Sequence, residues 1–597
     1  ATTINAHGIY IFNSTVNIDD IDITSVAYSG IYIKSSLVGG NPGSTVSLND
    51  VFVDGCQTGV SIEQGSYPTL TWTGITVHHS SSYPLYASIY QYATLTGVSV
   101  SWAGIAMLAM WESYLYSSCT LPYRSLPYYA LGNLNLNNGA VLTLQPGVGL
   151  RLPQYGKIIL QGGSSLIANG TAPLPITMYA GGDYYWKGIS LDSNCSAQLD
   201  YCQFNRCGYP EYGPEPVIFT YNAASLSISN TTIPGGTSDG IVVTGSSAFN
   251  LTLNNVHIED CPGTGLYIVN GATILDYTNL SITGCGRPLQ IPANLLDFLD
   301  EQPVLADNTH NRIFLHNSGY LYRDTTIRDW GYPYVCESID INVNWVNFTI
   351  DPGCVIQMGY SQGFYVNGTI NAVGTAEDPI LITRLPGSTQ NWRGFYLNEG
   401  TSYAHFNYCI LEHCASSNQY SHIQDAFTIY RADTVLIENT QIIDAYCRAV
   451  VLESNNNDND DVVINNLSID GCGMDAVLQY ASGYNLTING LTVNGCNAFP
   501  VSVSANWAHQ ITGFTLTNNA HNVIRFLNGG YLVSQTLANH GYPYQISGSP
   551  LYVNYTNVTF LPGTVFYFEQ SRSLEVSGTL TAHGTAENPI IFDRPAG

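Results

Sequence analysis

Carboxylate and amide side chains gather most densely between residues 455 and 461, where the chain reads Asn-Asn-Asn-Asp-Asn-Asp-Asp. Oxygen ligands at such short spacing can wrap a hard cation, so Asp458, Asp460 and Asp461 are candidate ligands for a structural Ca²⁺. The alternative is a solvated corner that projects from the fold. We favour the corner, because the segment has neither the spacing nor the glycine pivot of an EF-hand. We expect no other cofactor.

Cysteines are the second group that could do chemistry. Cys202 and Cys207 recur as Cys409 and Cys414, 207 residues later, so a repeat preserves their spacing. They either form local disulfides in an oxidising exterior or line the core as small apolar side chains. For these four we favour disulfides slightly, without assigning the pairing. Stacked core positions are the favoured interpretation for another five cysteines, namely Cys261, Cys285, Cys447, Cys472 and Cys496.

Asparagine supplies a third kind of candidate site, the N-glycosylation sequon. With Asn, Ser and Thr so common, about this many sequons arise by chance, so they permit a glycosylated exterior without demonstrating one. Together with the low content of charged residues they favour a secreted chain at the cell surface. The twelve sequons begin at Asn13, Asn169, Asn194, Asn230, Asn250, Asn279, Asn347, Asn367, Asn466, Asn485, Asn554 and Asn557.

The chain repeats itself over long distances. A Pro-Gly phrase occurs at Pro146, Pro352 and Pro562, and a Trp-x-Gly phrase at Trp186 recurs at Trp392. Each Pro-Gly phrase is followed by a Gly-Thr phrase and a Pro-Ile pair. We therefore divide the chain into superrepeats of about 206 to 211 residues, complete over 109–314 and 315–525 and partial over 1–108 and 526–597.

A finer period lies inside each superrepeat. Cys261 and Cys285 are 24 residues apart, as are Cys472 and Cys496, and each cysteine follows two short segments of alternating apolar residues. Short alternating strands with Gly and Asn at the corners leave no room for helices. The pattern predicts an all-β solenoid with coils of about 24 residues. The segment 292–312 breaks the pattern, and either a helical turn or an excursion loop would explain it.

These phrases resemble those of right-handed parallel β-helix proteins, specifically a group of secreted prokaryotic surface proteins. The scarcity of Lys beside abundant Asn, Thr and Tyr adds a resemblance to archaeal ones. The resemblance covers nearly the whole chain and implies the fold rather than an activity. The same fold also carries polysaccharide lyases and hydrolases, so an enzyme must be argued from its site.

Catalytic motifs of those enzymes are incomplete in this chain. A polygalacturonase-like site needs several carboxylates with a Gly-His-Gly and an Arg-x-Lys, whereas here Asp460 and Asp461 lack such companions. A pectate-lyase-like site needs Ca²⁺ beside a basic residue, and the chain has only three lysines. We therefore expect no catalytic residue and no enzymatic activity.

Composition excludes some partners and favours others. A formal net charge of −26 would repel nucleic acid, and no apolar run is long enough to span a membrane. Neither terminus reads as a polar cap, which indicates either a longer array or stacking of open ends. We predict an extracellular structural protein, a β-helix subunit of a surface filament, sheath or adhesin that associates with itself. The alternative is a carbohydrate-active or glycan-binding surface protein.

Overall fold

A computed structural model describes residues 6–36, 43–208, 215–269, 272–416, 425–453, 460–480, 484–527 and 530–595. The chain forms two compact units. The first comprises residues 1–290 with 301–311, and the second comprises residues 291–300 with 312–597. Both are built from short strands that pair in parallel with the equivalent strand of the next coil. The predicted right-handed parallel β-solenoid, with a coil spacing of about 24 residues, is confirmed.

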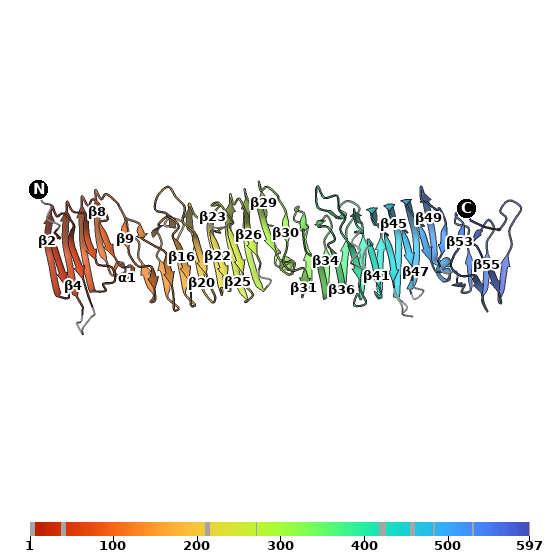
Figure 1. The fold of residues 1–597 in the computed structure, drawn as a ribbon, viewed down its shortest axis with the longest axis horizontal. Coiled ribbons are helices and arrows are strands. Elements are labelled where there is room, and N and C mark those ends of the chain that lie inside the picture. Colours follow the sequence, from red (N-terminus) through yellow and green to blue (C-terminus); the bar gives the residue numbers. More distant parts are fainter. Residues whose placement is uncertain are drawn as a thin grey trace. The chain divides into compact units, whose positions relative to one another are not determined.

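In the first unit, successive coils place their strands side by side, as Figure 1 shows from β2 to β29. One row of paired strands is β1 (Ile9–Phe12), β3 (Ser29–Lys34), β5 (Thr58–Ile62), β7 (Leu85–Ala87), β9 (Leu108–Met110), β12 (Tyr128–Ala130), β15 (Gly149–Leu152), β18 (Ile176–Ala180) and β21 (Cys202–Asn205). A second is β11 (Cys119–Leu121), β14 (Val141–Leu144), β17 (Ser165–Asn169) and β20 (Ser196–Asp200). Both rows join the long strands β23 (Ser225–Pro234), β25 (Phe249–Glu259) and β27 (Thr273–Thr283), followed by β29 (Val304–Ala306).

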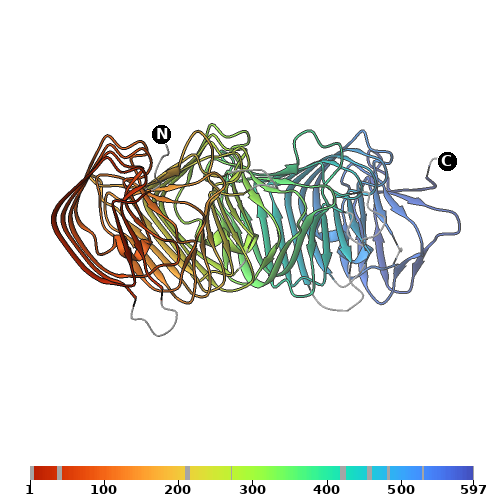
Figure 2. The same cartoon turned by 60° about the vertical axis from the view of Figure 1, so that its left-hand side comes forward.

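Two further rows complete this unit. One is β10 (Tyr114–Leu115), β13 (Leu134–Leu136), β16 (Lys157–Leu160), β19 (Gly188–Leu191), β22 (Ile218–Tyr221), β24 (Ile241–Thr244), β26 (Thr264–Ile268) and β28 (Arg287–Ile291). The other, in the earliest coils, is β2 (Thr15–Thr24), β4 (Thr45–Asp54), β6 (Thr69–His78) and β8 (Thr96–Ser101). Figure 2 shows these coils following one another from a turned view.

The second unit repeats the plan. One row is β34 (Ile341–Ile350), β36 (Gly363–Val373), β39 (Tyr403–Asn407), β42 (Thr434–Glu438), β45 (Asp460–Cys472), β47 (Tyr484–Cys496) and β49 (Ile511–Thr517). Another is β35 (Val355–Met358), β37 (Ile380–Arg384), β40 (Cys409–Glu412) and β43 (Gln441–Ala445), which also reaches β45. A third is β38 (Gly394–Leu397), β41 (Phe427–Tyr430), β44 (Val450–Glu453), β46 (Val477–Gln479), β48 (Val501–Val503), β50 (Ile524–Phe526), β53 (Tyr544–Ile546), β56 (Val565–Phe568) and β59 (Ile591–Asp593).

Alternation within each strand decides what enters the core. In β45 the buried residues Val462 and Ile464 lie opposite Leu486 and Ile488 of β47, so aliphatic side chains stack from coil to coil. Aromatic residues stack in the same way. The rings of Phe364 and Phe395 lie 4.5 Å apart, and that of Phe427 lies 5.4 Å from Phe395.

Short helical turns interrupt the coils, which corrects the expectation that no helix would fit. They are α1 (Ile89–Tyr92), η2 (Ala293–Phe298) and η3 (Ala505–Gln510). The second lies in the segment that breaks the repeat pattern, where a helical turn was one of two expectations. All three follow a short core strand at intervals close to the superrepeat length, so they belong to the repeat. Among the described residues, no helix has the length and apolar character needed to cross a membrane.

Asparagine ladders close one corner of the coils. In the second unit Asn439 donates from Nδ2 to Asn407 at 3.0 Å and accepts from Asn466 at 3.1 Å. In the first unit Asn255 and Asn279 extend an equivalent ladder from Asn230. The backbone of Asn439 has φ of 43°, a left-handed conformation that asparagine and glycine adopt more readily than other residues. The ladder residue therefore supplies both the corner conformation and a coil-to-coil hydrogen bond.

We expect Asn439→Ala to destabilise the second unit by about 2 kcal/mol, because it loses both ladder bonds and strains the left-handed corner. Asn439→Gly keeps the backbone conformation, so the expected loss is about 1 kcal/mol. Hydrogen exchange of the amides in β42 and β43 measures both losses. The matched control is Gln441→Ala on the exposed face of β43. Unchanged exchange in Asn439→Ala would contradict this role for the ladder.

Candidate functional site

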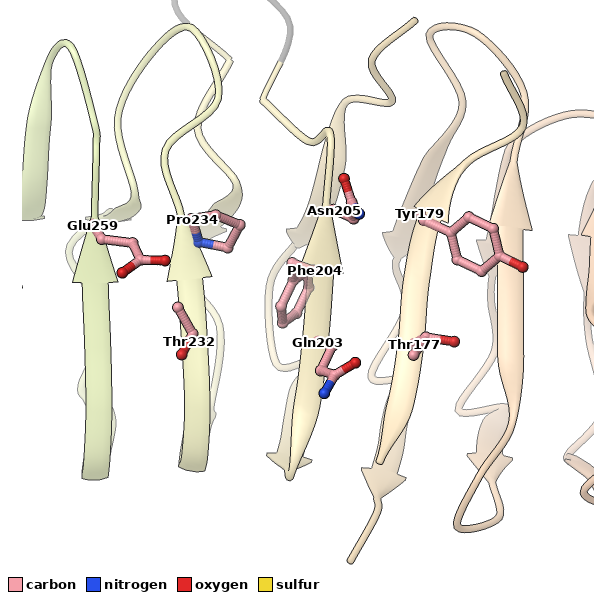
Figure 3. Close-up of a pocket in the computed structure, with 8 residues that line it drawn as sticks. All are labelled: Thr177, Tyr179, Gln203, Phe204, Asn205, Thr232, Pro234 and Glu259. Carbon is pink, nitrogen blue, oxygen red and sulfur yellow. The ribbon is translucent and has the colours of Figure 1, made fainter. Parts of the chain in front are cut away.

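A groove crosses the coils of the first unit on the face formed by β18, β21, β23 and β25 (Figure 3). It encloses about 520 Å³. A polar pocket of about 360 Å³ shares Tyr179 and Asn205 with it, so the two form one continuous depression. The groove lining is Thr177, Tyr179, Gln203, Phe204, Asn205, Thr232, Pro234 and Glu259, and the polar pocket adds Arg151, Ala180, Gly182, Asp183 and Arg206.

Strand register builds this depression. Arg151 of β15 lies opposite Tyr179 of β18, which lies opposite Asn205 of β21. In a second column Gln203 lies between Thr177 and Thr232. These side chains alternate with core residues along each strand and therefore point outward. Residues that are about a coil apart in sequence thus become neighbours along the stacking direction.

Charged groups lie at the two ends of the depression. At one end the Arg151 guanidinium stands 5.0 Å from the centre of the Tyr179 ring, and Arg206 donates to Asp183 at 2.8 Å. At the other end lies Glu259, opposite Pro234 on the neighbouring strand. The middle is lined by neutral amides and hydroxyls. Partial burial raises the pKa of Tyr179, so its hydroxyl stays protonated at neutral pH.

Such a surface can stack an apolar ring face and hydrogen-bond many hydroxyls. Hydrolysis of a glycosidic bond normally uses two carboxyl groups on either side of the bond. Glu259 is the one carboxylate among the described residues that line the groove itself, and Asp183 is fully exposed and paired with Arg206. The arrangement therefore suits binding of a sugar chain better than acid and base catalysis. Sequence analysis missed this site, because no single motif contains it.

The candidate Ca²⁺ ligands are only partly described. Asp458 lies outside the described residues. Asp460 is buried and Asp461 is exposed, because consecutive residues of β45 face opposite sides of the strand. Asp461 accepts a hydrogen bond from Asn485 at 2.7 Å. Among the residues with described positions, no three His, Cys, Asp or Glu side chains form a metal-binding group, so a cation site here stays a prediction.

The recurrent cysteine pairs are buried and present as thiols. Cys202 donates to the Ala168 carbonyl and Cys409 donates to the Ala372 carbonyl, each at 3.2 Å. The superrepeat therefore preserves a sulfur-to-backbone contact as well as a spacing. Burial raises the pKa of Cys202, Cys207 and Cys409 to about 12, and that of Cys414 also upward. The structure thus favours the core interpretation for all four, whereas the sequence slightly favoured disulfides.

The register between adjacent coils also decides which cysteines lie opposite one another. Cys472 and Cys496 lie opposite each other on adjacent coils, as predicted. The residue opposite Cys472 on the preceding coil is Ala445, so Cys447 does not continue the ladder and that part of the prediction is wrong. The reason is a coil of 27 residues at this step, which shifts the alignment by two positions relative to the cysteine spacing.

Five sequon asparagines already use the side-chain nitrogen to which a glycan would be attached. Each donates from Nδ2 to a residue of the preceding coil, with distances from 2.6 to 3.1 Å. A glycan on any of them would disturb a coil-to-coil contact. Glycan occupancy at all twelve sequons stays a prediction. The five are Asn230, Asn279, Asn347, Asn466 and Asn485.

We expect iodoacetamide to leave Cys202, Cys207, Cys409 and Cys414 unlabelled in the folded protein at pH 8, because the thiolate form is rare and buried. In denaturant without reductant all four should be labelled. Peptide mass spectrometry measures both states, and a sample treated with reductant is the control. Labelling that appears only after reduction would show disulfides and contradict the thiol assignment.

Comparison with known proteins agrees with the fold and leaves the activity open. No curated protein matches the chain. One solved structure, the catalytic domain of a GH87 alpha-1,3-glucanase in complex with tetrasaccharides, aligns over 73% of this chain and 67% of its own, with 12% identity and a TM-score of 0.17. That likeness is too low to carry an argument about activity. Residues 176–285 match the family model "Right handed beta helix region", which includes the described strands of the groove from β18 to β25.

Proposed function

We propose that this chain is an extracellular structural protein whose coils associate end to end in a surface filament, sheath or adhesin. The observation that carries the proposal is the continuous stacking of strands and core side chains from coil to coil, which reaches β57 (Leu574–Val576), β58 (Thr579–Ala582) and β59. Each of these strands is paired on one side only. Val576 and Phe592 are about half exposed, although equivalent inward residues of earlier coils are buried.

The core column supports the same conclusion. Tyr544, Phe566 and Phe592 stack at 5.6 Å and 5.4 Å on successive coils, and the first two are fully buried. A further coil from a second copy would bury Phe592 and pair the free strand edges. The mostly neutral polar exterior and the sequons support a location outside the cell.

We expect Phe592→Asp to prevent assembly, because it places a charge in the column that a second copy would bury. The matched control is Ile591→Asp on the outward side of the same strand, which should assemble normally. Negative-stain electron microscopy and light scattering of the full chain measure assembly. A wild-type chain that stays monomeric at high concentration would overturn the proposal, as would filaments of unchanged length in Phe592→Asp.

A second candidate function is polysaccharide binding along the groove. It is favoured by the aligned columns of Arg151, Tyr179 and Asn205 and of Thr177, Gln203 and Thr232, which offer one ring face and repeated hydrogen-bonding groups. A sugar chain lying across the coils would meet a side chain able to form a hydrogen bond at each coil. This function does not exclude the structural one, because the groove lies on the lateral face of the coils.

We expect Tyr179→Ala to weaken retardation of the protein by xylan or polygalacturonate about fivefold in affinity gels, because an aromatic contact contributes about 1 kcal/mol. The matched control is Tyr446→Ala, an exposed tyrosine of the second unit that lines neither pocket. Equal retardation of both variants and the wild type would contradict binding in the groove.

A further inference from the structure

A second cavity in the first unit has a different chemistry from the groove. It encloses about 690 Å³, within the range of about 300 to 1,000 Å³ that small-molecule sites occupy. The turn after β5, the helical turn α1, the segment after β9 and strand β10 meet there. Five of its nine lining residues are aromatic. The lining is Gln64, Tyr67, Tyr90, Trp111, Glu112, Ser113, Tyr114, Tyr116 and Ser117.

The aromatic rings are arranged in two pairs. Tyr114 and Tyr116 alternate along the chain and expose the same face, with ring planes 10° apart and centres 6.2 Å apart. Tyr67 lies 5.7 Å from Trp111 with a tilt of 58°. Each of the three tyrosines is more than half exposed. Large exposed rings gathered at a cavity mark a binding surface more often than scattered ones do.

Hydrogen bonds hold this surface in place. The Tyr90 hydroxyl accepts from the backbone amides of Tyr116 and Ser117 at 3.1 Å and 3.2 Å. Glu112 Oε2 accepts from the Ile89 amide at 2.8 Å and so fixes the start of α1. A site whose parts are already fixed loses little conformational entropy when a ligand binds.

Two buried polar atoms in the lining residues lack partners. They are Nε1 of Trp111 and Oε1 of Glu112, and both residues are more than nine-tenths buried. Among the described residues the structure gives neither atom a hydrogen bond, which costs folding free energy. Both atoms are almost completely covered, so the groups available to a ligand are the exposed rings and the other polar side chains of the lining.

We propose that this cavity binds a neutral oligosaccharide, with sugar rings stacked on Tyr114 and Tyr116 and hydroxyls bonded to Gln64, Ser113 and Ser117. These polar side chains are uncharged. This site is independent of the groove and goes beyond the structural function.

A quaternary ammonium ion is the rival ligand for a cavity rich in aromatic rings. Such a ligand would need a stable negative charge nearby. Burial raises the pKa of Glu112 to about 7, so below neutral pH its carboxyl group is mostly uncharged. The Ile89 amide also occupies one carboxylate oxygen. These features favour the neutral saccharide.

The superrepeat supplies an internal control. In the second unit Tyr320 and Tyr322 form an equivalent exposed pair, with centres 6.1 Å apart and planes 13° apart, beside η2. The positions that correspond to Trp111 and Glu112 are Asn317 and Ser318. The tyrosine pair therefore recurs without the two buried polar groups, and the complete site belongs to the first unit.

Isothermal titration calorimetry of the full chain tests the proposal, with cellohexaose, chitohexaose, laminarihexaose and maltohexaose as probes and choline as the rival. We expect at least one hexasaccharide to bind and Tyr114→Ala to weaken it about tenfold, since stacking and an adjacent hydroxyl contact are both lost. Trp111→Phe replaces the indole with a smaller ring beside Tyr67, so a smaller loss of about threefold is expected.

Tyr320→Ala and Tyr446→Ala are the matched controls, and both should bind the hexasaccharide like the wild type. Loss of binding in Tyr179→Ala alone would move the saccharide to the groove and overturn the proposal. The absence of binding by all four hexasaccharides at millimolar concentration would overturn it as well. Binding of choline without any saccharide would assign the cavity to cations. Circular dichroism of each variant confirms that the coils remain folded.

Discussion

Coil-to-coil hydrogen bonding is the constraint on which the rest of this structure depends. Each strand meets its backbone partners in the preceding and following coils, so adjacent coils must keep their strands in register. A residue then has as its neighbour the residue at the same position one coil away. Like side chains consequently stack into columns of aliphatic residues, aromatic rings and asparagines. This requirement explains why the sequence repeats.

The same constraint explains where binding surfaces can arise. A regular coil presents a narrow strip of outward side chains, too small to hold a ligand. Stacked coils place several such strips side by side. The groove at Tyr179 forms because Arg151, Tyr179 and Asn205 lie opposite one another on successive coils. Where a coil departs from regularity, as at α1, a cavity of larger volume forms beside the helical turn. Regular and irregular coils therefore produce different kinds of site.

Charged side chains are few, and some of them form ion pairs that are largely buried. Asp425 is fully buried and its carboxylate receives two hydrogen bonds from Arg448, at 2.7 Å and 3.0 Å. Arg525 likewise reaches Asp475 at 2.7 Å across two coils while lying over the Phe499 ring. Asparagine and threonine side chains supply many other contacts between coils. A mostly neutral exterior lets coils stack closely without repulsion between like charges on successive turns.

The sequence by itself determined the fold class, because alternation at a coil spacing of about 24 residues has few other structural solutions. It also located the core positions of Cys472 and Cys496, since those depend on local period. Register between coils of unequal length was decided only by the tertiary structure. The coil of 27 residues put Ala445, not Cys447, opposite Cys472. The tertiary structure also decided the two candidate sites. Gln64 and Ser117 of the cavity are distant in sequence, and so are Arg151 and Glu259 at the two ends of the groove. Only the stacking of coils brings the residues of each site onto one surface.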